Sequence, residues 1–131
     1  MLDHVSIAVG DLARAEAFYD AVMAALGVPK VAGSDAGFLG YGERCDASNP
    51  ERSYLSVRLG RRPELAPGRH WCFKAPSRAA VDAFWRAGLA QGGTDDGAPG
   101  LRPHYHPHYY AAFLRDPDGN RVEAVFHRAE V

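Results

Sequence analysis

Two histidines and one glutamate in this sequence have the chemistry of a transition-metal site. His4, His70 and Glu123 lie far apart along the chain, and each occurs in a run of β-branched and aromatic residues that predicts a strand. Neutral imidazoles and a carboxylate bind divalent metals, and three such ligands leave further positions open for water or substrate. An open site of this kind polarises a bound oxygen, or supports redox chemistry where the metal is iron.

The chain repeats itself once, and the repeat aligns the two histidines. The segment HVSIAVGDLARAEAFYDA (4–21) matches HWCFKAPSRAAVDAFWRA (70–87), so that His4 corresponds to His70 and Phe18 to Phe84. Two strand–helix units that begin with the same residue indicate an internal duplication.

Helix signals follow each of these two strands. Apolar residues recur at helical spacing after Asp11 and after Ser77, which are both good N-cap residues, and glycines end each run. Further strands are predicted at about 28–32, 36–42 and 53–59. Two apolar runs around the sequence DPDG (116–119) predict a hairpin with a type I turn and a glycine bulge.

Alternation along the predicted strands places the three candidate ligands on one face. Side chains of a strand point alternately to its two faces. His4, His70 and Glu123 each lie opposite the apolar set of their own strand, so all three should lie on the side of the sheet away from the helices. With the glycine bulge counted, Phe113 comes opposite Glu123 and lines the same surface.

These features resemble the vicinal oxygen chelate superfamily, which includes glyoxalase I, bleomycin-resistance proteins, fosfomycin-resistance proteins and extradiol dioxygenases. HVSIAVGDLARAEAFYDAVMAALG resembles the first strand and helix of its βαβββ module, and FLRDPDGNRVEAV resembles the final hairpin. The resemblance implies an α+β fold in which two tandem βαβββ modules form a curved mixed sheet or an open barrel-like cleft. Residues 1–131 would form one glyoxalase-like domain with modules 1–60 and 69–127 and a linker, 60–68. The metal ligands of the family match His4, His70 and Glu123.

One position departs from glyoxalase I, which has a fourth ligand, a glutamate, on the last strand of its first module. Here that strand reads SYLSVRL, and the equivalent position is about Ser56, which we expect to contact substrate instead. Lactoylglutathione lyase activity is therefore disfavoured. Relatives with three ligands include extradiol dioxygenases and fosfomycin thiol transferases, so one divalent metal is still expected, and His and Glu accept Fe, Mn, Ni, Co or Zn.

A histidine-rich segment, GAPGLRPHYHPHYYAAF (97–113), precedes the final hairpin. Its three prolines exclude a helix and predict a stiff, extended loop in which His104, His106 and His108 point the same way. We expect His104 or His106 to act as a general base, and Arg102 to pair with a carboxylate or phosphonate of the substrate. A second metal site and a surface loop at a dimer interface are the alternatives.

The bulk properties exclude several classes of partner. A net charge of −1 over 131 residues argues against nucleic-acid binding, and the absence of a run of about 18 apolar residues argues against a membrane span. Cys45 and Cys72 are too few for a disulfide framework, and no signal-peptide pattern opens the sequence. We expect a cytoplasmic protein, and the resemblance implies a homodimer if the modules pair across chains.

The leading hypothesis is therefore a metal-dependent enzyme of this superfamily, acting on a small oxygen-bearing substrate chelated to the metal. Lyase or isomerase, dioxygenase and thiol transferase chemistry all remain open. The alternative is a metal-free protein that sequesters a drug or ligand, as bleomycin-resistance proteins do. A third possibility is a metal site that remains as a relic without turnover.

Overall fold

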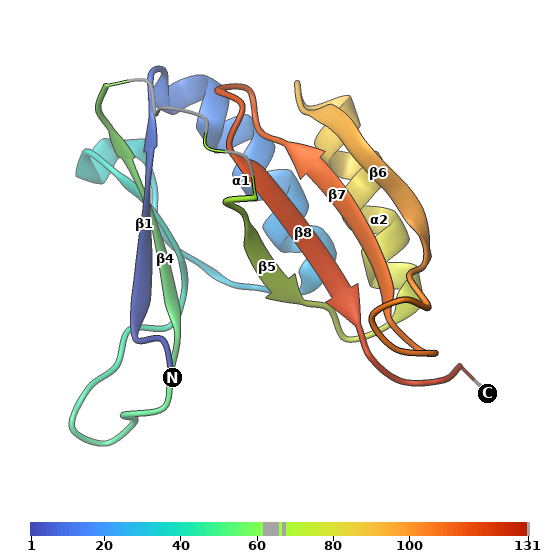
Figure 1. The fold of residues 1–131 in the computed structure, drawn as a ribbon. Helices are drawn as coiled ribbons and strands as arrows, with labels where there is room; N and C mark the ends of the chain where they lie inside the picture. The colour runs from blue at the N-terminus through green and yellow to red at the C-terminus, as the bar shows by residue number, and fades with distance from the viewer. Residues whose placement is uncertain (62–65, 67, 131) are drawn as a thin grey trace.

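The computed structural model describes residues 1–61, 66 and 68–130, which form two four-stranded sheets and two α-helices (Figure 1). The first half contains β1 (His4–Val9), α1 (Leu12–Leu26), β2 (Lys30–Ala32), a short 3-10 helix (Ser34–Ala36), β3 (Leu39–Gly42) and β4 (Tyr54–Leu59). The second half contains β5 (Trp71–Lys74), α2 (Arg78–Ala90), β6 (Thr94–Leu101), β7 (Tyr110–Arg115) and β8 (Arg121–Phe126). Most of the expected linker, residues 62–65 and 67, lies outside the described residues.

The two halves share one topology, as expected for a duplication. The strand orders are β1-β4-β3-β2 and β5-β8-β7-β6. In each module the strand that comes first along the chain pairs in parallel with the one that comes last, β1 with β4 and β5 with β8. The α+β fold of two tandem βαβββ modules is therefore confirmed. Each module keeps its own sheet, and β1 and β5 lie at sheet edges.

Local signals in the sequence position these elements as predicted. The side chain of Asp11 accepts a hydrogen bond from the Arg14 amide at 3.0 Å, which caps the first turn of α1. Ser77 caps α2 in the same way, accepting from the Ala80 amide at 3.0 Å. In the final hairpin, Gly119 has a φ of 91°, and the register pairs Phe113 with Glu123 as predicted.

The histidine-rich segment is not the extended loop that the sequence predicts. Residues 94–101 form β6, whose glycines and Pro99 are tolerated because β6 is an edge strand with two irregularities of register. The loop that follows closes in two tight turns, in which the Tyr105 amide donates to the Arg102 carbonyl and the Tyr109 amide to the His106 carbonyl. Proline occupies the second position of each turn, which its fixed φ favours.

A smaller difference concerns the predicted strand at 36–42. Only Leu39–Gly42 pairs with β4, because the chain before it forms the 3-10 helix and then turns at Gly37, which has a φ of 84°. The serine and aspartate that begin this helix favour turns over strands.

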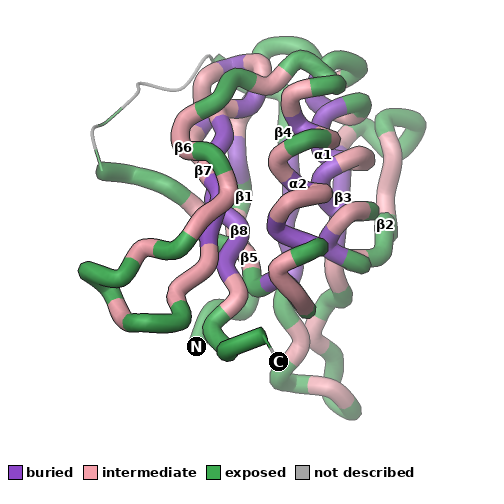
Figure 2. The backbone as a smooth tube through the Cα atoms, turned by 90° about the vertical axis from the view of Figure 1, so that its right-hand side faces the viewer, coloured by how far each residue is buried: buried purple, intermediate pink, exposed green. Residues whose placement is uncertain are grey.

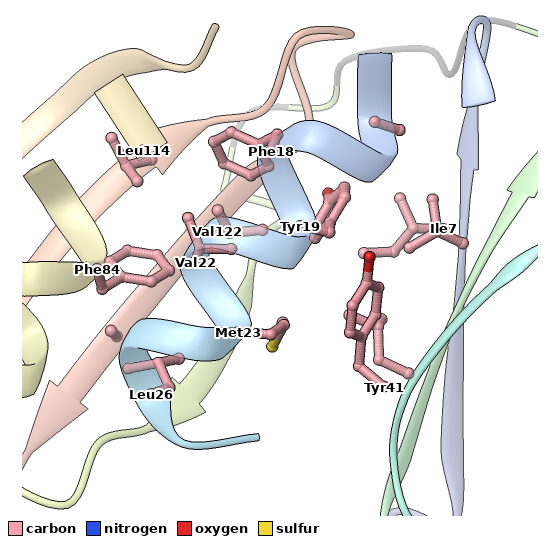
Figure 3. Packing of buried hydrophobic residues seen from close by; sticks show 14 of the residues in the cluster. Ile7, Phe18, Tyr19, Val22, Met23, Leu26, Tyr41, Phe84, Leu114 and Val122 are labelled. Atoms are coloured by element: carbon pink, nitrogen blue, oxygen red, sulfur yellow. The ribbon is translucent and has the colours of Figure 1, made fainter. Parts of the chain in front are cut away.

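Helix α1 contributes to the cores of both modules. Figure 3 shows Tyr19 and Met23 directed toward Ile7 and Tyr41 of the first sheet, with Phe18 on the opposite side of the helix. That opposite side also carries Val22 and Leu26, which pack with Phe84, Leu114 and Val122 of the second module. One continuous core therefore joins the two halves.

The helices cover one face of each sheet and leave the other face open. In Figure 2 both helices lie between the strands of the second sheet and strands β2 and β3 of the first. On β1, Ile7 and Val9 are buried while His4 and Ser6 are exposed, so His4 lies on the open face. Within the described residues no helix is long and apolar enough to cross a membrane.

Candidate metal centre

His70, just before the edge strand β5, and Glu123 of β8 lie together on the open face of the second sheet. Nε2 of His70 lies 3.3 Å from Oε2 of Glu123, and the glutamate is only 1% exposed. Two donors bound at about 2.0–2.1 Å to one tetrahedral metal lie about 3.3 Å apart. The separation of these two atoms therefore fits two ligands of a common metal ion.

The other nitrogen of His70 also favours metal binding. Nδ1 lies 3.3 Å from the Gly68 carbonyl, which can only accept a hydrogen bond, so the proton belongs on Nδ1. The lone pair of Nε2 then points toward the Glu123 carboxylate. Metal-binding histidines commonly hold their second nitrogen in this way, because it fixes both the tautomer and the ring.

Tyr109 holds the other oxygen of the glutamate. Its hydroxyl donates a hydrogen bond of 2.6 Å to Oε1 of Glu123. Burial, together with this bond to the carboxylate, raises the pKa of Tyr109 above its usual range, so the phenol stays protonated and remains a donor. Oε2 is thereby left for His70 and for a metal.

The surroundings of the pair are both aromatic and polar. The Phe113 ring lies 6.1 Å from the His70 ring, and the Arg102 guanidinium lies 5.6 Å from the centre of Phe113. Arg102 donates to the carbonyls of Gly100 and Ala98, which fixes its position and uses part of its hydrogen-bonding capacity.

Cys72 lies beside Glu123 on the adjacent strand, in register with it. Burial and the negative charge of the glutamate raise the pKa of the Cys72 thiol, so the thiol stays protonated at neutral pH. A protonated thiol is a poor nucleophile, so Cys72 acts as a wall of the site.

His4 lies on the open face of the other sheet. Its Nδ1 is 2.7 Å from the Asp3 carboxylate, and the hydrogen bond lowers the pKa of Asp3. Nε2 of His4 is thus available in the same manner as Nε2 of His70. Among the described residues no three His, Cys, Asp or Glu side chains converge on one point, so a single chain does not bring His4 to the His70–Glu123 pair.

The strand registers identify Ser56 as the counterpart of Glu123 in the first module. Ser56 pairs with Ser6 of β1 just as Glu123 pairs with Cys72 of β5, and Ser6 and Cys72 correspond in the internal repeat. Ser56 therefore occupies in β4 the place that Glu123 occupies in β8.

His104 and His106 lie in the loop between β6 and β7. Nε2 of His106 is 2.9 Å from Nδ1 of His127, and the His104 ring lies 4.2 Å from the Tyr105 ring. Tyr109 is the member of this loop that reaches Glu123, and sequence reasoning missed that contact. Tyr109 opens the apolar run of the predicted hairpin and has no motif of its own, and its contact with Glu123 depends on the turn at 106–109.

Comparisons with known proteins agree with this fold. The sequence model of the Glyoxalase/Bleomycin resistance protein/Dioxygenase superfamily matches residues 1–124. A crystal structure of a glyoxalase/bleomycin resistance protein from Albidiferax ferrireducens T118 is 33% identical, covers 98% of each chain and has a TM-score of 0.73. No curated protein matches the chain.

Two further structures share the fold at lower identity. A glyoxalase/bleomycin resistance protein/dioxygenase family enzyme from Burkholderia phytofirmans PsJN is 21% identical, with a TM-score of 0.66 over 96% of this chain and 98% of that one. A lactoylglutathione lyase from Agrobacterium tumefaciens is 24% identical, with a TM-score of 0.59 over 95% of this chain and 92% of that one.

Proposed function

Because the chain belongs to the glyoxalase/bleomycin resistance protein/dioxygenase superfamily, we propose that it is an enzyme whose divalent metal is held by His4, His70 and Glu123. The observation that carries this proposal is the 3.3 Å separation of His70 Nε2 and Glu123 Oε2, with Nδ1 of His70 turned to a carbonyl. A divalent ion, whether Fe, Mn, Ni, Co or Zn, would supply Lewis acidity to a substrate oxygen, or redox chemistry in the case of iron.

The residues around the pair have distinct roles in this proposal. Tyr109 fixes the Glu123 carboxylate, and Phe113 and Arg102 form the wall against which a small substrate rests. His106 is the proposed proton carrier, since its ring lies 5.5 Å from that of Tyr109 and its Nε2 contacts His127. His104, farther along the same loop, is the second candidate for a general base.

We further propose that two copies of the chain complete the site. His4 and the His70–Glu123 pair lie on the open faces of two separate sheets, and the edge strands β1 and β5 are free to lie against another chain. A cytoplasmic homodimer that joins the first module of one copy to the second module of the other would bring the three ligands together. The free thiols of Cys45 and Cys72 agree with a reducing compartment.

The residue at position 56, a serine, limits which reactions the proposed enzyme would catalyse. A serine in place of the fourth ligand argues against lactoylglutathione lyase activity. Isomerase or other lyase chemistry, dioxygenation and thiol transfer to a small oxygen-bearing substrate remain compatible with three protein ligands.

One observation favours the alternative, a metal-free protein that sequesters a ligand. His104, Tyr105, Tyr109 and His127 form a run of neighbouring rings, with centroids 4.2, 4.8 and 5.2 Å apart, beside the open face of the second sheet. Such a run offers stacking surface to a flat aromatic ligand.

Metal content separates the two functions. We expect protein purified without an affinity tag to hold about one metal per chain, and Glu123→Gln and His70→Ala to hold none, because each removes a ligand. His108→Ala is the matched histidine control and should keep the metal. Wild-type protein that stays metal-free after incubation with each candidate ion would contradict the enzyme and favour sequestration.

A further inference from the structure

A basic and aromatic pocket lies on the open face of the first sheet, beside His4. We propose that it binds an anionic group of the substrate, either a carboxylate or a phosphoryl group. The pocket has a volume of about 290 Å³, near the lower end of the range for small-molecule sites. Its lining consists of Asp3, His4, Ser6, Arg44, Cys45, Tyr54, Ser56 and Arg58.

Two arginines are held in place by aromatic rings. The Arg44 guanidinium lies 4.8 Å from the centre of Tyr54 and 5.7 Å from that of Phe38, and Arg58 lies 4.6 Å from Phe38. Tyr54 is itself fixed, because its ring lies directly over Gly40, where any Cβ would collide with the phenol. Cation–π contacts orient a guanidinium without neutralising its charge.

Neither arginine has a carboxylate partner among the described residues. Within the described residues, the one hydrogen bond of the Arg44 side chain goes to the Tyr54 hydroxyl at 3.3 Å, and the one side-chain contact of Arg58 is with the Phe38 ring. The acidic residue in the pocket, Asp3, is hydrogen-bonded to His4. Two positive charges with unused donors therefore face one cavity, which is the arrangement that recognises carboxylates and phosphates.

Ser56 supplies a second, independent indication of a ligand. It is 2% exposed, and its Oγ is buried without a hydrogen-bond partner in the described parts of the chain. Leaving a buried hydroxyl unpaired costs about 1–3 kcal/mol, so the Oγ atom is a donor that a ligand oxygen would satisfy. Ser56 lies on β4 between Tyr54 and Arg58, on the same face of the strand.

The position of the pocket indicates the role of the anion. His4 belongs to the pocket lining, so a molecule whose anionic end is held by Arg44 and Arg58 would extend toward the metal ligand. Calling this molecule the substrate rests on the proposed function. The anion site itself depends only on the residues of the first module.

The test uses metal-free, chelator-treated full-length protein, with malonate and inorganic phosphate as probes and sodium chloride at equal ionic strength as the reference. Calorimetry should detect binding of at least one of the two anions to the wild type. Arg44→Gln and Arg58→Gln should each weaken it roughly tenfold or more, because each removes a charge-assisted hydrogen bond. Arg86→Gln, at an exposed position of α2, is the matched control and should leave the affinity unchanged.

The two probes distinguish the two chemistries, since selective binding of malonate would indicate a carboxylate and selective binding of phosphate a phosphoryl group. The proposal is overturned if neither anion binds the wild type, or if Arg44→Gln and Arg58→Gln bind as tightly as Arg86→Gln. Metal titration of the same samples keeps the two claims apart. A wild type that binds the anion and no metal would contradict the proposed enzyme and still support the pocket.

Discussion

The hydroxyl of Tyr109 donates a 2.6 Å hydrogen bond to Oε1 of Glu123, a carboxylate that is almost fully buried on the open face of the second sheet. Tyr109 comes from a loop that two proline turns fold back over the sheet, whereas Glu123 belongs to the central strand β8. The loop therefore acts directly on the proposed metal ligand, because it fixes which of the two oxygens remains free.

Removing this bond should weaken metal binding without abolishing it. We expect Tyr109→Phe to lower the affinity for a divalent ion roughly tenfold, as is usual when a partner of a metal ligand is lost. Calorimetric titration with zinc or cobalt would measure the change. Tyr105→Phe, which alters an exposed ring of the same loop, is the control. Equal affinities for the two variants would contradict the role given to Tyr109.

The final hairpin fastens the second module to the first. Tyr19 of α1 donates a 2.6 Å hydrogen bond to Asp116, and the Gly10 amide donates to Asp118 at 3.0 Å. Asn120 also donates to the Ala8 carbonyl at 3.2 Å. The conspicuous DPDGN sequence is thus a polar clamp between modules as well as a turn.

Loss of one bond of this clamp should destabilise the whole domain. We expect Tyr19→Phe to lower the free energy of unfolding by about 1–3 kcal/mol, because it removes a buried donor to a carboxylate. Urea unfolding at pH 7 would measure it, with Tyr105→Phe as a tyrosine control outside the core. A loss below about 0.5 kcal/mol would show that the remaining donors to Asp116 suffice.

The same tyrosine should make stability sensitive to alkaline pH. Burial and the charge of Asp116 raise the pKa of Tyr19 well above its ordinary value of about 10. The folded state then holds the phenolic proton more tightly than the unfolded chain. This contribution is complete below pH 10 and declines as the pH rises further.

Urea unfolding between pH 8 and 11 should therefore show a steeper loss of stability for the wild type than for Tyr19→Phe. The Tyr19→Phe protein keeps some slope, since burial also raises the pKa of Tyr110 to about 12, with a further contribution from its bond to Asp82. Parallel curves for the two proteins would mean that Tyr19 titrates alike in the folded and unfolded states.

Sequence reasoning succeeded where local chemistry decides the structure. The caps at Asp11 and Ser77 depend on residues three positions away, and the pairing of Phe113 with Glu123 depends on the tight turn between their two strands. The topology of the two modules came from the resemblance to the superfamily, and the strand orders confirm it.

The sequence did not predict the structure where contacts between distant residues determine it. Strand β6 forms because it pairs with β7, and this pairing outweighs the low strand propensity of its glycines and proline. The contact of Tyr109 with Glu123 and the approach of Arg44 to Phe38 depend on how the loops fold back over the sheets. No periodicity in the sequence encodes such contacts.

The packing between the helices makes another prediction, at Gly88. A glycine-to-alanine change inside a helix normally stabilises it by about 1 kcal/mol. Here an added Cβ would collide with Leu114 and crowd Phe18, so Gly88→Ala should instead lower the stability by about 1–3 kcal/mol. Ala79→Gly, at an exposed position of α2, measures how helix propensity alone changes the free energy of unfolding. A stabilised Gly88→Ala protein would contradict the close approach of the helices.

The central claim is that two copies of the chain share each metal site, with His4 from one and His70 and Glu123 from the other. A direct test pairs His4→Ala chains with Glu123→Gln chains and measures the metal content of the isolated mixed dimers. Each variant alone should bind no metal, whereas a mixed dimer should regain one intact site and hold one metal per two chains. If the wild type binds metal and the mixed dimers hold none, the ligands come from one chain and the shared site is wrong.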